Sequence, residues 1–168
     1  YWLNHNAEAL TWHATEVMNA RRSRALPHVA TRFREKQGVT EVLVYAGDRP
    51  GLFASLAAAI SASGADIADA RVHTTKDGAA FDVFSVQTTD HQPFGLRDPD
   101  LLSSMVERLN RAALADHPLP AAKPTSRRNA AFSIEPWVRI DNDLTPHATV
   151  VEASGRDRLG LLAELAHV

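Results

Sequence analysis

The sequence contains no cysteine among its 168 residues. This absence excludes disulfide bonds, catalysis by a thiolate, and zinc sites built on cysteine. An excess of charge of one sign is lacking too, because 18 basic residues nearly balance 20 acidic ones and the net charge is −2. The composition therefore gives no indication of binding to nucleic acid or to a membrane surface.

Long apolar runs and targeting signals are also missing. No segment reaches the roughly 20 apolar residues of a membrane-spanning helix, and no signal peptide is visible. The first residue is Tyr1 rather than Met, and the chain stops at Val168 inside a repeated pattern. We therefore expect a piece of a larger cytoplasmic protein. With 45% hydrophobic residues, it can bury the core of one or two small domains.

The most informative stretch is residues 47–54, which read Gly-Asp-Arg-Pro-Gly-Leu-Phe-Ala. Before it, Val42, Val44 and Ala46 alternate with Glu41, Leu43 and Tyr45, a period of two residues that is typical of a strand, and helical spacing follows it. We expect Asp48 to cap the helix, Pro50 to occupy its opening turn, and Gly51 to let another group approach the backbone. Main-chain N–H groups at such a helix N-terminus can bind a carboxylate or phosphate.

Periodicity along the rest of the chain predicts the other elements. Asp77 before Gly78 is a typical hairpin turn, and prolines 118, 120 and 124 indicate an extended linker. The order strand, helix, strand, strand, helix, strand is that of an α+β, ferredoxin-like β-α-β-β-α-β unit. We expect helices at 1–20, 50–63 and 98–116, strands at 39–46, 66–75, 80–87 and 132–140, and a connector at 26–37 that can include a short helix.

The stretch around the first turn occurs twice. Residues 157–166 match residues 48–57 at an offset of 157 − 48 = 109, with identical Asp, Arg, Gly, Leu, Ala, Leu and Ala positions. Leu159 stands where the first copy has Pro50, so the second turn is less rigid. Self-similarity of this kind indicates two copies of one unit, of which the second is cut off.

A unit of this order whose first turn reads Asp-Arg-Pro-Gly-Leu resembles an ACT domain, a regulatory module that typically binds small amino acids. Further segments resemble the C-terminal region of the family of bifunctional uridylyltransferase and uridylyl-removing enzymes, which act on the PII nitrogen-signalling protein. These segments are residues 1–3, 12–13, 42–53, 69–78, 81–84 and 157–162.

The resemblance implies a function and a domain order. The parent enzyme would be a nucleotidyltransferase with uridylyl-removing hydrolase activity, its Mg²⁺ held by catalytic domains upstream. This fragment would itself have no catalytic residue. Residues 1–37 would be a helical linker after a hydrolase domain of the HD type, 38–141 the first ACT domain, and 142–168 the truncated start of a second.

The resemblance also implies an effector, L-glutamine, and partners, namely PII through the whole enzyme and other ACT units through self-association. Glutamine would favour the removal of uridylyl groups when nitrogen is plentiful. The effector would lie at the first turn, with the second turn as another half-site. The residues concerned are Asp48, Arg49, Pro50, Gly51, Leu52, Phe53, Asp157, Arg158, Gly160 and Leu161.

The residues alone leave alternatives open. An amino acid could place its carboxylate near Gly51 and its ammonium group near Asp48. Alternatively, Asp48 is only a cap and Gly51 only admits a neighbouring subunit, as in a dimerisation module without a ligand. Regulation of another amino-acid-controlled enzyme is a third possibility.

Catalysis and metal binding within this chain have little support. His73 and Asp82 are interpreted as exposed strand residues, and no nucleophile with a base can be assembled around them. His5 and His13 are eight residues apart in the sequence, and no third ligand is near them. We therefore expect neither an active site nor a metal site.

Overall fold

The structure is a computed structural model that describes residues 7–115, 135–145, 149–155 and 158–166. Predictions for residues 1–6, the proline-containing linker, the beginning of the strand at 132–140 and Asp157 lie outside these ranges. The chain divides into two units, one of residues 1–123 with 159–168 and one of residues 124–158.

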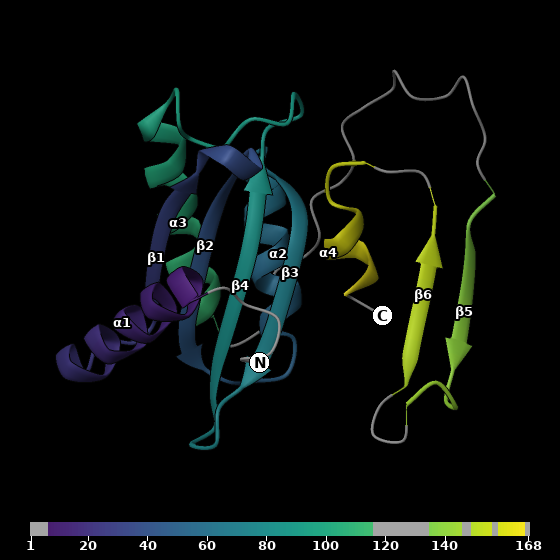
Figure 1. Ribbon diagram of the computed structural model, residues 1–168, viewed down its shortest axis with the longest axis horizontal. Coiled ribbons are helices and arrows are strands. Elements are labelled where there is room, and N and C mark those ends of the chain that lie inside the picture. The colour runs from purple at the N-terminus through teal and green to yellow at the C-terminus, as the bar shows by residue number, and fades with distance from the viewer. Residues whose placement is uncertain (1–6, 116–134, 146–148, 156–157, 167–168) are drawn as a thin grey trace. The chain divides into compact units, whose positions relative to one another are not determined.

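The first unit contains a four-stranded antiparallel sheet (Figure 1). Its strands lie in the order β1-β2-β4-β3. The predicted hairpin turn joins β3 to β4, and the backbone N–H of Thr75 donates to the carbonyl of Ala79 at 2.8 Å. The bounds of the strands are β1 His28–Arg34, β2 Val39–Gly47, β3 Asp66–Thr74 and β4 Ala79–Gln87.

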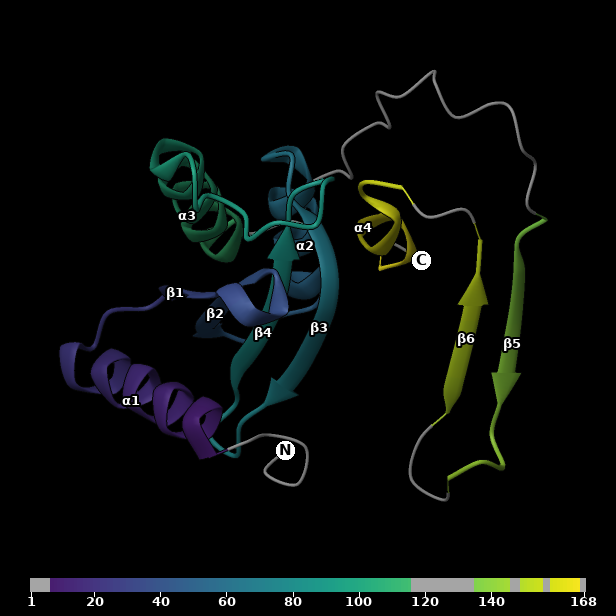
Figure 2. The same cartoon turned by 45° about the horizontal axis from the view of Figure 1, so that its top comes forward.

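Helices cover both faces of this sheet (Figure 2). Helices α2 (Leu52–Ala62) and α3 (Pro99–Leu114) pack on one face, and α1 (Ala7–Ser23) packs on the other. Side chains alternate accordingly along β2, because Val42 and Val44 face α2 and α3 whereas Leu43 and Tyr45 face α1. The two central strands, β2 and β4, are therefore buried on both sides.

The prediction of a connector over residues 26–37 is wrong for residues 28–34, which form a strand, whereas the short helix expected in this stretch is present. Strand β1 occupies most of this stretch and pairs with β2 from His28 with Tyr45 to Arg34 with Val39, and a short 3-10 helix, η2 (Glu35–Gln37), follows it. The expected boundary at residue 37 thus runs between two paired strands. Arg32 and Arg34 interrupt the apolar pattern of this edge strand, which hides its β character in the sequence.

The second unit contains a two-stranded sheet of β5 (Trp137–Asp141) and β6 (Val150–Ser154). The strand predicted near 132–140 therefore exists, but it does not complete the first sheet, because β1 already occupies the edge beside β2. Two strands cannot bury an apolar face alone, and Val138, Ile140 and Val151 are exposed.

The other helices and strands of the first unit agree with their predictions in type. Helix α2 (Leu52–Ala62) begins after its N-cap residue Gly51, so the prediction that Pro50 occupies its opening turn is wrong. Helix α3 begins after Asp98, whose side chain accepts a hydrogen bond from the backbone N–H of Leu101, and Pro99 is its first residue. None of the helices in the described part of the chain is both long enough and apolar enough to cross a membrane.

Candidate functional site

The first turn connects β2 to α2 through a left-handed glycine. Gly51 has a φ of 74° and is the N-cap residue of α2, and no side chain caps this helix. The prediction that Asp48 caps it is wrong, because Asp48 lies three residues before the cap position. Its carboxylate instead accepts a hydrogen bond from the hydroxyl of Thr74 at 2.8 Å, which joins the turn to the end of β3.

Arg49 anchors the turn from the other side. Its guanidinium group donates to the carbonyl oxygen of Ala112 at 2.8 Å and to that of Pro50 at 3.3 Å. Ala112 lies in the last turn of α3, where free carbonyl groups carry partial negative charge. Arg49 therefore holds the turn against α3, which gives this predicted site residue a structural role.

A cavity of about 220 Å³ opens at this turn. Five of the six residues predicted at the first turn line it, and the exception, Pro50, is exposed. The sequence prediction missed the strand residues opposite the turn and the contribution of the second repeat. The lining residues are Asp48, Arg49, Gly51, Leu52, Phe53, Ala54, Val72, His73, Thr74, Ala80, Asp82 and Ala166.

Asp82 is the most unusual group in this cavity. It lies on β4 between Ala80 and Phe84, both of which face α2 and α3, so its side chain points to the same face. Its side chain is not exposed as predicted, because the residue is only 1% accessible to solvent. The Oδ1 atom has no hydrogen-bond partner among the described residues. A buried polar atom without a partner is rare in proteins.

The environment of Asp82 favours its neutral form. Burial raises the pKa of the Asp82 carboxyl to about 7, and the negative charge of Asp48 raises it further, whereas a hydrogen bond from the backbone N–H of His73 opposes this shift. The imidazole of His73 stacks on Phe81, which faces α1. Burial also lowers the pKa of His73.

The second turn has the backbone of the first. Gly160 has a φ of 87° and is the N-cap residue of α4 (Leu161–Leu165), again without a side-chain cap. The N–H of Glu164 donates to the carbonyl of Gly160 at 3.0 Å, as that of Ser55 does to Gly51. The repeat in the sequence is therefore a repeat in conformation, even though Leu159 replaces proline.

Helix α4 packs antiparallel to α2 in the first unit. A Cβ atom placed on Gly160 would lie 3.8 Å from that of Ser61, near the end of α2, and Ala163 packs with Ala57 and Ala58. Ala166, just beyond α4, lines the cavity at the beginning of α2. The two turns thus lie at opposite ends of α2, and the structure does not bring Gly160 and Leu161 to the cavity. A role for the second turn in effector binding stays a prediction.

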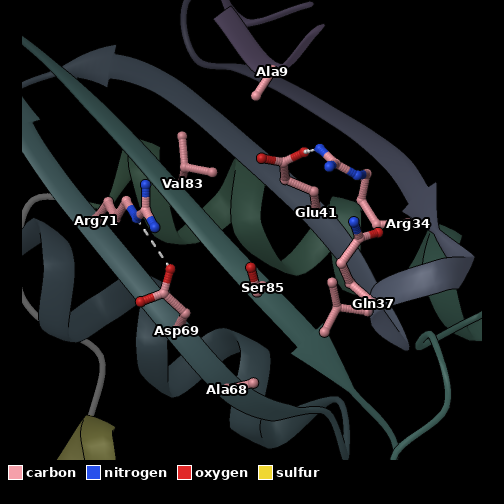
Figure 3. Close-up of a pocket in the computed structure, with 10 residues that line it drawn as sticks. Ala9, Arg34, Gln37, Glu41, Ala68, Asp69, Arg71, Val83 and Ser85 are labelled. Atoms are coloured by element: carbon pink, nitrogen blue, oxygen red, sulfur yellow. Dashed lines mark hydrogen bonds and ion pairs between the residues drawn. The ribbon is translucent and has the colours of Figure 1, made fainter. Parts of the chain in front are cut away.

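A larger cavity, of about 350 Å³, lies on the face of the sheet that α1 covers in part (Figure 3). Its charged side chains are already paired, Arg34 with Glu41 at 3.4 Å and Arg71 with Asp69 at 3.2 Å. Although this cavity is larger, its charged groups have partners, whereas the cavity at the first turn contains a carboxyl oxygen without one among the described residues. The other lining residues are Ala9, Gln37, Val39, Ala68, Val83 and Ser85.

Glu41 at this larger cavity belongs to a network that attaches α1 to the sheet. It contacts His13 of α1 at 3.1 Å and Arg32 at 2.6 Å, and the guanidinium of Arg32 lies 4.4 Å from the ring centroid of Trp12. Burial raises the pKa of Glu41, but the hydrogen bonds from His13 and Arg32 outweigh it and hold the value at about 2. This carboxylate is therefore charged at neutral pH and structural.

Comparison with known families agrees with this architecture, because the ACT domain family matches residues 40–111. The chain contains an ACT domain. The match begins in β2 and ends in α3, so it includes the first turn and the strands opposite it. No solved structure gives a significant match.

The ACT domain lies within a longer similarity to bacterial enzymes. The chain is 48% identical to the bifunctional uridylyltransferase/uridylyl-removing enzyme of Phenylobacterium zucineum. This match includes 80% of the chain and 15% of that protein. The chain is 40% identical to the enzyme of the same name from Azospirillum brasilense over 98% of its length, covering 18% of that protein. It is 36% identical to the Chromobacterium violaceum enzyme of that name over 100% of its length, covering 20% of that protein. The chain therefore corresponds to the ACT region of these enzymes and spans a fifth or less of their length.

Proposed function

We propose that the chain is the amino-acid-sensing region of a bifunctional uridylyltransferase/uridylyl-removing enzyme and that its effector is L-glutamine. Bound glutamine would shift the longer enzyme from uridylylation of PII towards removal of the uridylyl group. The enzyme would act in the cytoplasm, with its Mg²⁺ in catalytic domains outside this chain. Among the described residues, no group of three or more His, Asp or Glu side chains fits a metal ion.

The observation that carries this proposal is the cavity at the first turn. It combines the N-terminus of α2, which carries partial positive charge, with the carboxyl groups of Asp48 and Asp82. A free amino acid has a carboxylate and an ammonium group on the same carbon atom. The cavity therefore matches both charged groups of such a ligand within one small space.

The size and polarity of the cavity favour a small ligand of moderate affinity. Its volume of about 220 Å³ is below the range of about 300–1,000 Å³ typical of sites for drug-sized molecules. One hydrogen bond to a charged group contributes roughly 1.5 to 3 kcal/mol. A few such contacts give binding that responds to changing metabolite concentrations, as a sensor requires.

A second candidate function is pairing of ACT units without a ligand. The contact of Ala163 with Ala57 and Ala58 favours it, because this contact joins the repeated helices α2 and α4. In this alternative, Gly51 and Gly160 only shape the turns of two helices that pair.

Isothermal titration of L-glutamine into the 168-residue chain tests the proposal, with L-glutamate and L-alanine as controls for specificity. Val72 lines the cavity and is 49% exposed, so Val72→Trp should obstruct the cavity and abolish binding. Leu101→Trp is the matched control, because Leu101 on α3 is 46% exposed and does not line the cavity. Unchanged binding by Val72→Trp would contradict this location, and no binding by the unaltered chain would favour the pairing function.

A further inference from the structure

Asp82 has an unsatisfied oxygen inside a cavity. Its Oδ1 atom has no partner among the described residues, although Asp82 is 1% exposed and lines the cavity at the first turn. The carboxyl receives one hydrogen bond, from the backbone N–H of His73. The repeat pattern does not identify this residue, because Asp82 lies on β4, away from the turn in the sequence.

Among the described residues, the ionisable groups around Asp82 do not include a cation that pairs with it. From the turn, Asp48 adds negative charge, and Arg49 directs its guanidinium to the carbonyl of Ala112. From β3, the ring of His73 stacks on Phe81 at the opposite face of the sheet. Helix α2 carries no ionisable side chain, so it contributes only its N-terminal dipole.

We propose that Asp82 binds the ammonium group of an α-amino acid whose carboxylate lies at the N-terminus of α2. This assignment rests on the proposed function, namely that the first-turn cavity holds an amino acid. The ammonium group supplies the hydrogen-bond donors and the positive charge that Asp82 lacks. The ligand therefore completes a buried interaction that the described part of the chain leaves open.

Asp48 is the weaker candidate for this role. It is exposed, and its carboxylate already accepts a hydrogen bond from Thr74 at 2.8 Å. Water screens an ion pair at an exposed carboxylate, whereas a pair at the buried Asp82 is screened much less. Asp48 instead acts on Asp82, because its negative charge opposes ionisation of the buried carboxyl until a cation arrives.

The binding step involves one proton. With a pKa of about 7, Asp82 is mostly protonated at pH 6 in the free chain. An ammonium ligand stabilises its carboxylate, so the O–H proton leaves Asp82 for the solvent as the ligand binds. Affinity should therefore rise as the pH increases from 6 to 8, and binding at pH 6 should release close to one proton.

Titrations with two ligands test the assignment. L-Glutamine and glutaramate differ only in that glutaramate lacks the α-ammonium group. Asp82→Asn should weaken the binding of glutamine roughly ten- to hundredfold and leave the binding of glutaramate unchanged. Asp69→Asn is the matched control, because Asp69 is an exposed acid on β3 that pairs with Arg71, and it should bind both ligands as the unaltered chain does.

A second measurement does not depend on the folding of a variant. Titration of the unaltered chain with glutamine in two buffers of different ionisation enthalpy counts the protons released at pH 6 and at pH 8. We expect close to one proton at pH 6 and close to none at pH 8. Binding of glutamine without proton release at pH 6, or equal binding by folded Asp82→Asn, would overturn the role of Asp82 and leave the proposed function intact. No binding of glutamine by the unaltered chain would overturn both.

Discussion

Replacement of Asp82 by asparagine should stabilise the free protein at high pH. Burial raises the pKa of Asp82 from its ordinary value of 3.8 to about 7, so the folded state binds the proton more tightly than the unfolded state does. The contribution of Asp82 to stability is therefore fully present below pH 3.8 and is lost as the pH rises to about 7. Asparagine has nearly the same shape and does not ionise, so it avoids this loss.

The size of the effect follows from the shift in pKa. A shift of about 3 units at about 1.36 kcal/mol per unit corresponds to about 4 kcal/mol in the free energy of unfolding above pH 7. For a chain of this length, 1 kcal/mol changes the melting temperature by roughly 2 to 4 °C. At each pH, the melting temperature of the unaltered chain is subtracted from that of Asp82→Asn. We expect this difference to be roughly 10 °C larger at pH 8 than at pH 4.

Thermal unfolding followed by circular dichroism at pH 4, 6 and 8, without ligand, measures this change. Referring each value to the difference at pH 4 removes the cost of placing an amide at this position. Groups that titrate in both proteins, such as Glu41, cancel in the comparison. A difference in melting temperature that does not change between pH 4 and pH 8 would refute the reasoning, because Asp82 would then have an ordinary pKa in the folded state.

Two further predictions concern stability measured by urea titration. Glu41→Gln should lower the free energy of unfolding by about 3 kcal/mol at pH 7, because the pKa of Glu41 is lowered from 4.5 to about 2. This stabilisation exists above pH 4.5 and disappears as the pH falls towards 2, so a loss of equal size at pH 3 would contradict it. Gly51→Ala should cost about 1 to 2 kcal/mol, since Gly51 has a φ of 74°. Gly47→Ala is its control, because a Cβ atom at Gly47 would meet nothing within 4 Å, and equal losses in the two variants would show that the left-handed conformation is not the cause.

The sequence was sufficient to predict the centre of the fold. The alternation in β2, the helical spacing of α2 and the Asp77-Gly78 turn are local patterns, and each gives the observed element. The repeat also predicted correctly that Gly160 starts a helix as Gly51 does. Such predictions succeed because these elements depend on the backbone conformation of neighbouring residues and on which of their side chains are buried.

Pairing and burial were harder to predict, because they depend on residues far apart in the sequence. Strand β1 was missed because its own composition does not mark it as a strand. It is a strand because it pairs with β2. Asp82 was predicted to be exposed, but β4 is covered on both faces, so no alternation marks an outward side. The hydrogen bond from Thr74 to Asp48 joins residues that are far apart in the sequence, so no local pattern predicts it.

The contact between α2 and α4 makes the cavity sensitive to the second repeat. Three alanines form its buried part, and a buried methyl or methylene group contributes about 0.8 kcal/mol. Ordering the backbone of a residue costs roughly 1 to 2 kcal/mol, so the packing of these alanines does not by itself offset the cost of ordering this five-residue helix. A molecule that fills the cavity beside Ala166 favours the docked helix, and by thermodynamic reciprocity a docked helix strengthens the binding of that molecule. Any interaction that holds α4 in its docked position would therefore also strengthen the binding of a molecule in this cavity.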